Sequence, residues 1–250
     1  MDALQFNKAV SQHCEESSDK REMKKFELTA ESKINILGKK LFRIKALIPF
    51  GNVREGDTGG WIEKEKNLSH FGNAWVYDNA EVFDNAWVFG NAKVYGNAKV
   101  YGNAKVRDNA EVYGNTKVSG NAWVFGNAWV FGNAKVFGNA KVFGNAWVRD
   151  NACVFGNVEV LGNANVLGNA EVRGNTDYAT IHGFGAWFRT TTFFRCKDKQ
   201  VRACCGCFFG TIPEFREQVK KTKKGKTAEE CLMVADLMEK HFTEEKESGE

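Results

Sequence analysis

Histidines, the side chains that most often transfer protons near neutral pH, are few in this chain and lie outside its repeated part. They are His13, His70, His182 and His241, and none falls between residues 72 and 179. We therefore expect no catalytic residue in the repeats. For an enzyme, the remaining candidates for a base are His70 or His182, supplied by a neighbouring subunit.

Four of the seven cysteines gather near the C-terminus, at Cys196, Cys204, Cys205 and Cys207. Zinc takes four thiolates or imidazoles in a tetrahedral arrangement, often from paired C-x-x-C motifs. This segment has a C-C-x-C run without such a partner, so we expect reduced cysteines in a strand and no metal or cofactor. The odd total without an evident disulfide framework favours a reducing compartment. The N-terminus lacks an apolar signal region and no run is apolar enough to span a membrane, so we expect a cytoplasmic protein.

A six-residue repeat dominates the middle of the chain. From Gly72 the unit [G/D]-N-A-x-V-x recurs eighteen times without an insertion, and its asparagine is present in every unit. Alanine and valine are two residues apart and therefore point to the same side of a strand. Glycine and asparagine tolerate the backbone angles of a tight corner. The repeat predicts short strands with an Ala/Val interior and stacked asparagines at the corners.

This V-x-G-N-A-x phase over residues 72–179 resembles the hexapeptide repeat of left-handed parallel β-helix proteins, in which three units form one triangular coil. The resemblance implies a mainly β protein with about six coils over residues 72–180. Enzymes of this fold include acyltransferases, which use a histidine base and a loop that leaves the coil, and γ-type carbonic anhydrases, which use a three-histidine zinc site. This chain has neither loop nor histidine in the repeats.

The segments on either side of the repeats are expected to cover the ends of the solenoid. Residues 41–69, "LFRIKALIPFGNVREGDTGGWIEKEKNLS", followed by "GNAWVYDNAEV", resemble the opening of YdcK-like hexapeptide-repeat proteins of bacteria and their phages. We expect a polar, mobile segment over residues 1–24 and a β cap over residues 25–71, with "GDTGG" as a turn rather than a phosphate loop, because the Lys-Ser/Thr ending of such a loop is missing.

Residues 181–250 are expected to form a small α+β domain with a solvated acidic tail. "TTTFFRCKDKQVRACCGCFFG" predicts a hairpin that turns at residues 197–200. Thr211 with Glu214, and Thr227 with Glu230, have the spacing of helix N-terminal capping boxes. In the second helix one face carries the apolar side chains Cys231, Val234, Ala235, Met238 and Phe242. The basic run "KKTKKGK" is expected to be a solvated loop between the helices.

Residues 18 apart should stack on the outside of a three-unit coil. One such row includes Tyr95 and Tyr113, and across one corner from it we expect the row Lys99, Lys117 and Lys135. Aromatic faces beside cations suit a stacked base and its phosphate. The sequence thus predicts a site for a small anionic nucleotide. Because nine basic residues balance nine acidic residues between 72 and 179, an extended nucleic acid is not expected.

Tryptophans on the repeats predict a second kind of contact. Outward positions carry Trp75, Trp87, Trp123, Trp129 and Trp147. Monomeric proteins seldom expose apolar patches beyond a few hundred square ångströms, and tryptophan is favoured at buried interfaces. We expect these five residues to form the interface of a homotrimer.

Taken together, these patterns favour a non-enzymatic binding or scaffold protein on a rigid β-solenoid. The resemblance to phage proteins suggests a sponge that sequesters a small nucleotide signal of host defence. Two alternatives are a hexapeptide-repeat acyltransferase and a structural, self-assembling protein. End-to-end assembly, as in bactofilins, requires bare solenoid ends, which the two caps would prevent.

Overall fold

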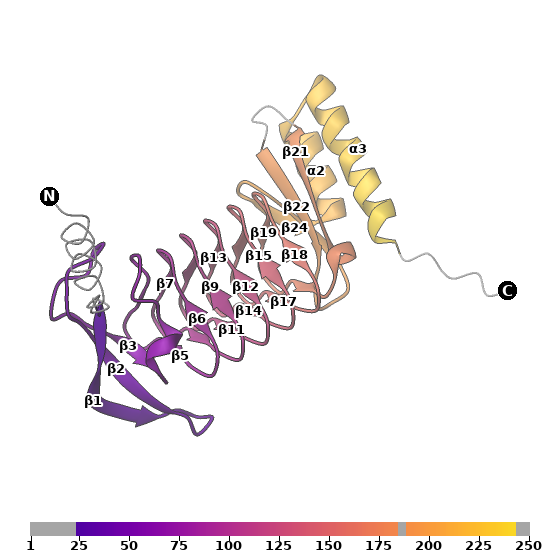
Figure 1. The fold of residues 1–250 in the computed structure, drawn as a ribbon. Helices are drawn as coiled ribbons and strands as arrows, with labels where there is room; N and C mark the ends of the chain where they lie inside the picture. The colour runs from indigo at the N-terminus through magenta and orange to yellow at the C-terminus, as the bar shows by residue number, and fades with distance from the viewer. Residues whose placement is uncertain (1–23, 185–188, 244–250) are drawn as a thin grey trace, which may run out of the picture.

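The computed structural model describes residues 24–184 and 189–243, and its centre is a parallel β-solenoid of about six turns (Figure 1). The predicted mobile N-terminal segment and acidic tail lie outside the described residues, apart from their inner ends. Seventeen two-residue strands form the solenoid. They are β4 (Trp75–Val76), β5 (Glu81–Val82), β6 (Trp87–Val88), β7 (Lys93–Val94), β8 (Lys99–Val100), β9 (Lys105–Val106), β10 (Glu111–Val112), β11 (Lys117–Val118), β12 (Trp123–Val124), β13 (Trp129–Val130), β14 (Lys135–Val136), β15 (Lys141–Val142), β16 (Trp147–Val148), β17 (Cys153–Val154), β18 (Glu159–Val160), β19 (Asn165–Val166) and β20 (Glu171–Val172).

Strands 18 residues apart pair in parallel, which confirms the predicted three-unit coil. For example, Lys117 lies opposite both Lys99 and Lys135. Three sheets result, with the strand orders β4-β7-β10-β13-β16-β19, β6-β9-β12-β15-β18 and β5-β8-β11-β14-β17-β20. We call the outer surface of the last of these sheets the basic face.

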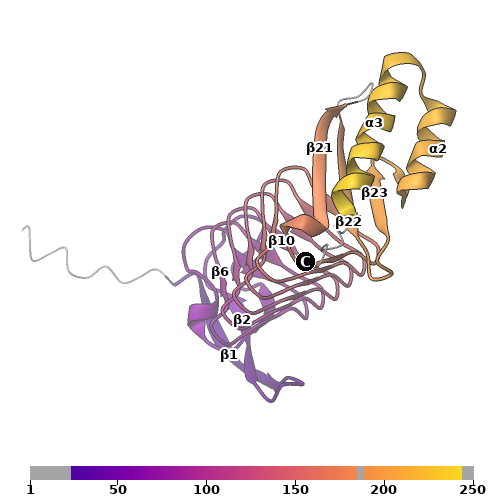
Figure 2. The ribbon, with the colours of Figure 1, turned by 90° about the vertical axis from the view of Figure 1, so that its right-hand side faces the viewer.

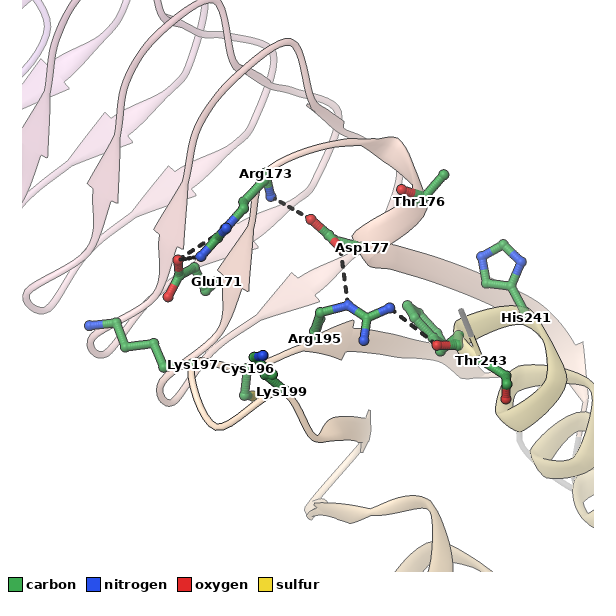
Figure 3. A pocket seen from close by; sticks show the side chains of 11 residues that line it. Glu171, Arg173, Thr176, Asp177, Arg195, Cys196, Lys197, Lys199, His241 and Thr243 are labelled. Atoms are coloured by element: carbon green, nitrogen blue, oxygen red, sulfur yellow. Dashed lines mark hydrogen bonds and ion pairs between the residues drawn. The ribbon is translucent and has the colours of Figure 1, made fainter. Parts of the chain in front are cut away.

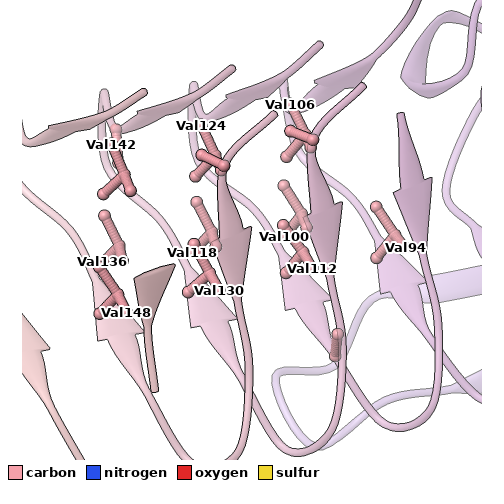
Figure 4. Close-up of a cluster of buried hydrophobic side chains, with 14 of the residues drawn as sticks. Val94, Val100, Val106, Val112, Val118, Val124, Val130, Val136, Val142 and Val148 are labelled. Carbon is pink, nitrogen blue, oxygen red and sulfur yellow. The ribbon is translucent and has the colours of Figure 1, made fainter. Parts of the chain in front are cut away.

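The interior is filled by the alanine and valine of each unit, as predicted. The valines of successive strands point inward from all three sheets and stack along the axis (Figure 4), and every one from Val76 to Val172 is fully buried. Where threonine replaces alanine, Thr116 is also buried, and its hydroxyl donates to the carbonyl of Tyr113. A buried hydroxyl needs such a partner.

The corners explain why each unit begins with glycine or aspartate. From Gly72 to Gly168 these residues have positive φ angles, such as 77° at Gly114 and 60° at Asp108, whereas Gly174, which begins the last unit, is extended. Aspartate stabilises this conformation by accepting a hydrogen bond from the next coil: the Asp108 carboxylate lies 3.2 Å from the amide nitrogen of Gly126. The asparagines that follow form three ladders of side-chain hydrogen bonds, such as Asn73 to Asn91 at 3.2 Å. The predicted corner ladders are thus confirmed.

The N-terminal cap is a β-meander that continues the sheet of the basic face. It contains β1 (Phe26–Ile34), β2 (Lys40–Ala46), β3 (Thr58–Ile62) and the short 3-10 helix η1 (Glu65–Asn67). Strand β3 pairs in parallel with β5, so the cap provides the layer above the first repeats. Two glycines of "GDTGG", Gly59 and Gly60, belong to β3 rather than to a turn. Glycine is required at 59 because a Cβ there would lie 2.6 Å from the Trp75 ring. Residues 63 and 64 connect β3 to η1.

The C-terminal domain covers the other end of the solenoid (Figure 2). After η2 (Asn175–Asp177), strands β21 (Tyr178–Phe184), β22 (Arg189–Arg195), β23 (Val201–Cys205) and β24 (Phe208–Thr211) form an antiparallel sheet, followed by α2 (Ile212–Thr222) and α3 (Gly225–Phe242). The predicted hairpin is β22–β23. The Phe194 side chain is buried in the solenoid core, and Ala170 bridges to Cys196.

The two helices pack on this sheet, and one of the two predicted helix starts is confirmed. Thr211 and Glu214 form the predicted capping box of α2. The start at Thr227 is wrong, because α3 already begins at Gly225. The "KKTKKGK" loop is therefore reduced to a short turn, with most of its lysines in the helices. The predicted apolar face of α3 is confirmed, since all five of its side chains are buried: Cys231, Val234, Ala235, Met238 and Phe242.

Candidate anion-binding surface

Two lysines of the basic face differ from all other basic residues of the solenoid. Of the nine basic residues between 72 and 179, seven have a carboxylate or an aromatic ring beside them. Lys117 and Lys135 have neither among the residues that the structure describes, and both are exposed. Their strands β11 and β14 are neighbours, so the two side chains leave the surface about 4.8 Å apart. Two like charges at this spacing repel each other and favour an anion.

Lys99, the third lysine of the predicted row, is already neutralised. Its ammonium lies 3.0 Å from the Glu81 carboxylate, which also binds Lys33 of β1 at 2.8 Å. Burial raises the pKa of Glu81, but the hydrogen bonds from Lys33 and Lys99 outweigh burial and lower it overall. Lys99 is therefore less available to a ligand than Lys117 and Lys135, and its predicted ligand role remains a prediction; through Glu81 it is linked to Lys33 of the cap.

Tyr95 and Tyr113 stack as predicted, so the ring faces that they turn toward each other are covered, and the second face of Tyr113 is covered by Phe131. Ring centroids lie 4.6 Å apart between Tyr95 and Tyr113, and 4.9 Å apart between Tyr113 and Phe131, with planes 5° from parallel. The Tyr95 hydroxyl donates at 2.9 Å to Glu111 of β10, which belongs to the same sheet as β7, and not toward Lys99. Burial and this hydrogen bond raise the pKa of Tyr95. A base could not stack between these rings without separating them.

A second aromatic row, on the basic face itself, is interrupted at one coil. Phe83 stacks on Tyr101 with centroids 5.0 Å apart, and Phe137 stacks on Phe155 at 4.9 Å. Between these two pairs the row has Ser119, which is partly exposed. We call the position left by Ser119 between the rings of Tyr101 and Phe137 the Ser119 gap. The 18-residue spacing places Ser119 in this row, but only the stacking of its neighbours reveals the gap.

The predicted interface tryptophans divide between two sheets. Trp129 and Trp147 stack at 5.3 Å on one sheet, whereas Trp87 and Trp123 lie on another. Trp87 and Trp147 are 40% and 41% exposed, which leaves them accessible to a partner. Trp75 is only 1% exposed, because Phe26 and Phe50 of the cap pack against its ring. The prediction that Trp75 takes part in an oligomer interface is therefore wrong.

A cavity of about 520 Å³ lies at the C-terminal end of the basic face (Figure 3). Its walls include two arginines held by carboxylates: Arg173 pairs with Glu171, and Arg195 lies 3.1 Å from Asp177. Lys197 and Lys199 also line the cavity, and neither forms an ion pair within residues 24–184 and 189–243.

Cys153 connects this cavity to the lysine pair. It lies opposite Lys135 on one side and opposite Glu171 on the other. Burial raises the pKa of its thiol, against the nearby positive charges of Lys135, Lys197 and Arg173. Basic side chains thus lie on both sides of Cys153, with Lys135 toward Lys117 and with Arg173 and Lys197 toward the cavity.

The histidines of the enzyme alternative lie at opposite ends of the chain's fold. In the cap, His70 accepts a hydrogen bond from the Lys25 amide at 3.1 Å, and its other ring nitrogen lies 2.8 Å from Glu65. His182 lies in β21, next to the Thr190 hydroxyl. His241 lines the cavity, and His13 lies outside the described residues.

The four C-terminal cysteines do not converge. Cys196 and Cys204 are buried, Cys205 is partly exposed and Cys207 is exposed. Burial raises the pKa of the Cys204 thiol to about 11. Within the described part of the chain, no group of three or more His, Cys, Asp or Glu side chains is placed to hold a metal ion. In the same residues, no helix combines the length and apolarity that crossing a membrane requires.

No model of a known protein family matches the chain, and a comparison with curated proteins finds no match either. The candidate anion-binding site is therefore inferred from the geometry of the basic face.

Proposed function

We propose that the protein is a non-enzymatic binding protein that captures a small anionic ligand on its basic face. The observation that carries the proposal is the pair Lys117 and Lys135, stacked in register and without a counter-ion among the described residues. The unpaired lysines of the cavity extend this positive surface. Because the chain's other solenoid cations are paired, an anion gains most by binding here.

Substituting the lysine pair tests this proposal. The double variant K117Q/K135Q should lose binding of the four ribonucleoside 5′-monophosphates and of pyrophosphate, as measured by titration calorimetry at low salt. The matched control K93Q/K141Q removes the same charge from two lysines that carboxylates already neutralise. It should bind like the unchanged chain. Equal binding by both double variants, or no binding by the unchanged chain, would contradict the proposal.

Within this proposal, the ligand is a small nucleotide and the assembly is a homotrimer that works in the cytoplasm. A YdcK-like relationship, supported by residues 41–82, would make the protein a phage-encoded sponge for a nucleotide signal of host defence. The exposed Trp87 and Trp147 side chains support self-association. Native mass spectrometry of protein purified from cells measures both properties: a trimer with a reproducible extra mass supports them, whereas a bare monomer contradicts them.

The geometry favours binding over the two alternatives. Both ring nitrogens of His70 contact groups of its own chain, which leaves no free nitrogen for an acyl-transfer base. If a H70A/H182A double variant transferred an acyl group at the same rate as the unchanged chain, an acyltransferase with either histidine as its base would be excluded. End-to-end assembly needs bare ends, whereas β1–β3 and β22 cover the first and last coils.

A further inference from the structure

The Ser119 gap has the dimensions of one missing ring. Tyr101 and Phe137 are two coils apart, and at about 4.8 Å per coil their rings are about 9.6 Å apart. A planar ring placed midway would lie about 4.8 Å from each neighbour. The ring pairs of this solenoid that stack at coil spacing have the same separation, with centroids from 4.6 to 5.3 Å apart.

The two rings that border the gap are each stacked on one side only. Tyr101 is nearly parallel to Phe83, with planes 3° apart, and Phe137 is nearly parallel to Phe155, with planes 6° apart. Their other faces are thus directed toward the coil of Ser119. No ring stacking or cation–π contact fills this coil from the described residues.

Another row shows what the solenoid does where an aromatic residue is absent. In the row of Phe89 and Phe125, the intervening residue is Arg107, whose guanidinium lies 4.4 Å from the centre of the Phe125 ring. A planar group thus takes the place of the missing ring. Ser119 has no planar group of its own, so its gap can accept one from a ligand.

The lysine pair lies beside this gap. Lys117 is the first residue of β11 and Ser119 directly follows the strand, two residues later, so in this extended stretch both point outward and their Cα atoms are about 6.6 Å apart. Lys135 belongs to the next coil, together with Phe137. We infer that the Ser119 gap binds one planar aromatic ring that carries a phosphate or carboxylate group, with the anionic group on Lys117 and Lys135. This inference rests on the proposed function and specifies its ligand class.

Binding of two matched probes to the full chain tests the inference. The ribonucleoside 5′-monophosphates have a ring and a phosphate, whereas ribose 5-phosphate has the phosphate alone. Because stacking on aromatic side chains changes affinity by about 5- to 150-fold, at least one nucleotide should bind about tenfold or more tightly than ribose 5-phosphate. Ser119→Phe should fill the gap and reduce nucleotide affinity to that of ribose 5-phosphate. Leu161→Phe adds a ring to a different row and should change neither affinity.

The outcomes separate this inference from the proposed function. If ribose 5-phosphate binds as tightly as every nucleotide, or if Ser119→Phe binds nucleotides like the unchanged chain, the ring site is wrong although anion binding stands. If no probe binds, both are wrong. If Ser119→Phe instead converts an oligomer to monomers, the gap receives a side chain of a second copy, and the ligand site is wrong.

Discussion

Filling the Ser119 gap should make the protein more stable. Ser119→Phe would place a ring between Tyr101 and Phe137 and create two stacked pairs where none exists. Each such pair contributes about 0.5–1.5 kcal/mol, and ordering the new side chain costs about 0.5–1 kcal/mol. The middle of these ranges gives a net gain of about 1 kcal/mol, which corresponds to an increase in Tm of about 2–4 °C for a chain of this size.

Circular dichroism recorded during thermal unfolding measures this gain in Tm. Two further variants serve as controls. Ser119→Ala removes the hydroxyl without adding a ring and should leave Tm nearly unchanged. Leu161→Phe adds a ring next to Phe143 alone, so its gain should be smaller than that of Ser119→Phe. If Ser119→Phe unfolds at or below the temperature of Ser119→Ala, the rings across the gap are not positioned to stack, and the reasoning behind the ring site is refuted.

Three further predictions concern single side chains. Burial lowers the pKa of Lys25 to about 8, so above that pH the unfolded chain binds more protons than the folded chain. The free energy of unfolding should therefore rise by up to about 2–3 kcal/mol between pH 8 and 10.5. Denaturant titrations of the unchanged chain and of Lys25→Met measure this rise, which should disappear in the variant. The pKa of Tyr95 is raised above 10, so its contribution is complete below pH 10 and is lost as the pH rises further; Tyr95→Phe should lose less stability than the unchanged chain above pH 10 in the same titration. At the corner formed by Asp108, the variant Asp108→Ala should lower the free energy of unfolding by about 2 kcal/mol, because alanine is strained at a positive φ and cannot accept the hydrogen bond from Gly126. Asp108→Gly loses only the hydrogen bond and should cost about 1 kcal/mol. Equal urea midpoints for the two variants would argue against backbone strain at this position.

The strands and corners of the solenoid were predictable because the information for each of them is local to one repeat unit. The alternation of Ala and Val fixes which side chains point inward, and the corner residues fix where each strand ends. The three units per coil that the resemblance to hexapeptide-repeat proteins implies then determine every row, including the stacking of Tyr95 on Tyr113. The direction of the Tyr95 hydroxyl was not predictable, since it depends on which nearby acceptor the side chain reaches.

The unpredicted contacts occur where distant segments meet the repeats. Lys99 looked available in the sequence, yet Glu81 neutralises it in a network that includes Lys33 from the cap. Trp75 looked like an outward residue, yet the cap covers it. The Ser119 gap was missed for another reason: its significance depends on ring planes, and a list of row members does not contain them.

The 18-residue register also limits how this gene can change in length. Losing one six-residue unit would rotate all later units by one third of a turn about the solenoid axis. A deletion between Lys117 and Lys135 would place the second lysine on another sheet and separate the charge pair, although the Ala/Val interior would remain intact. Only insertions or deletions of whole coils preserve the outer rows. Natural variants of different length should therefore differ by multiples of 18 residues wherever the basic face is under selection.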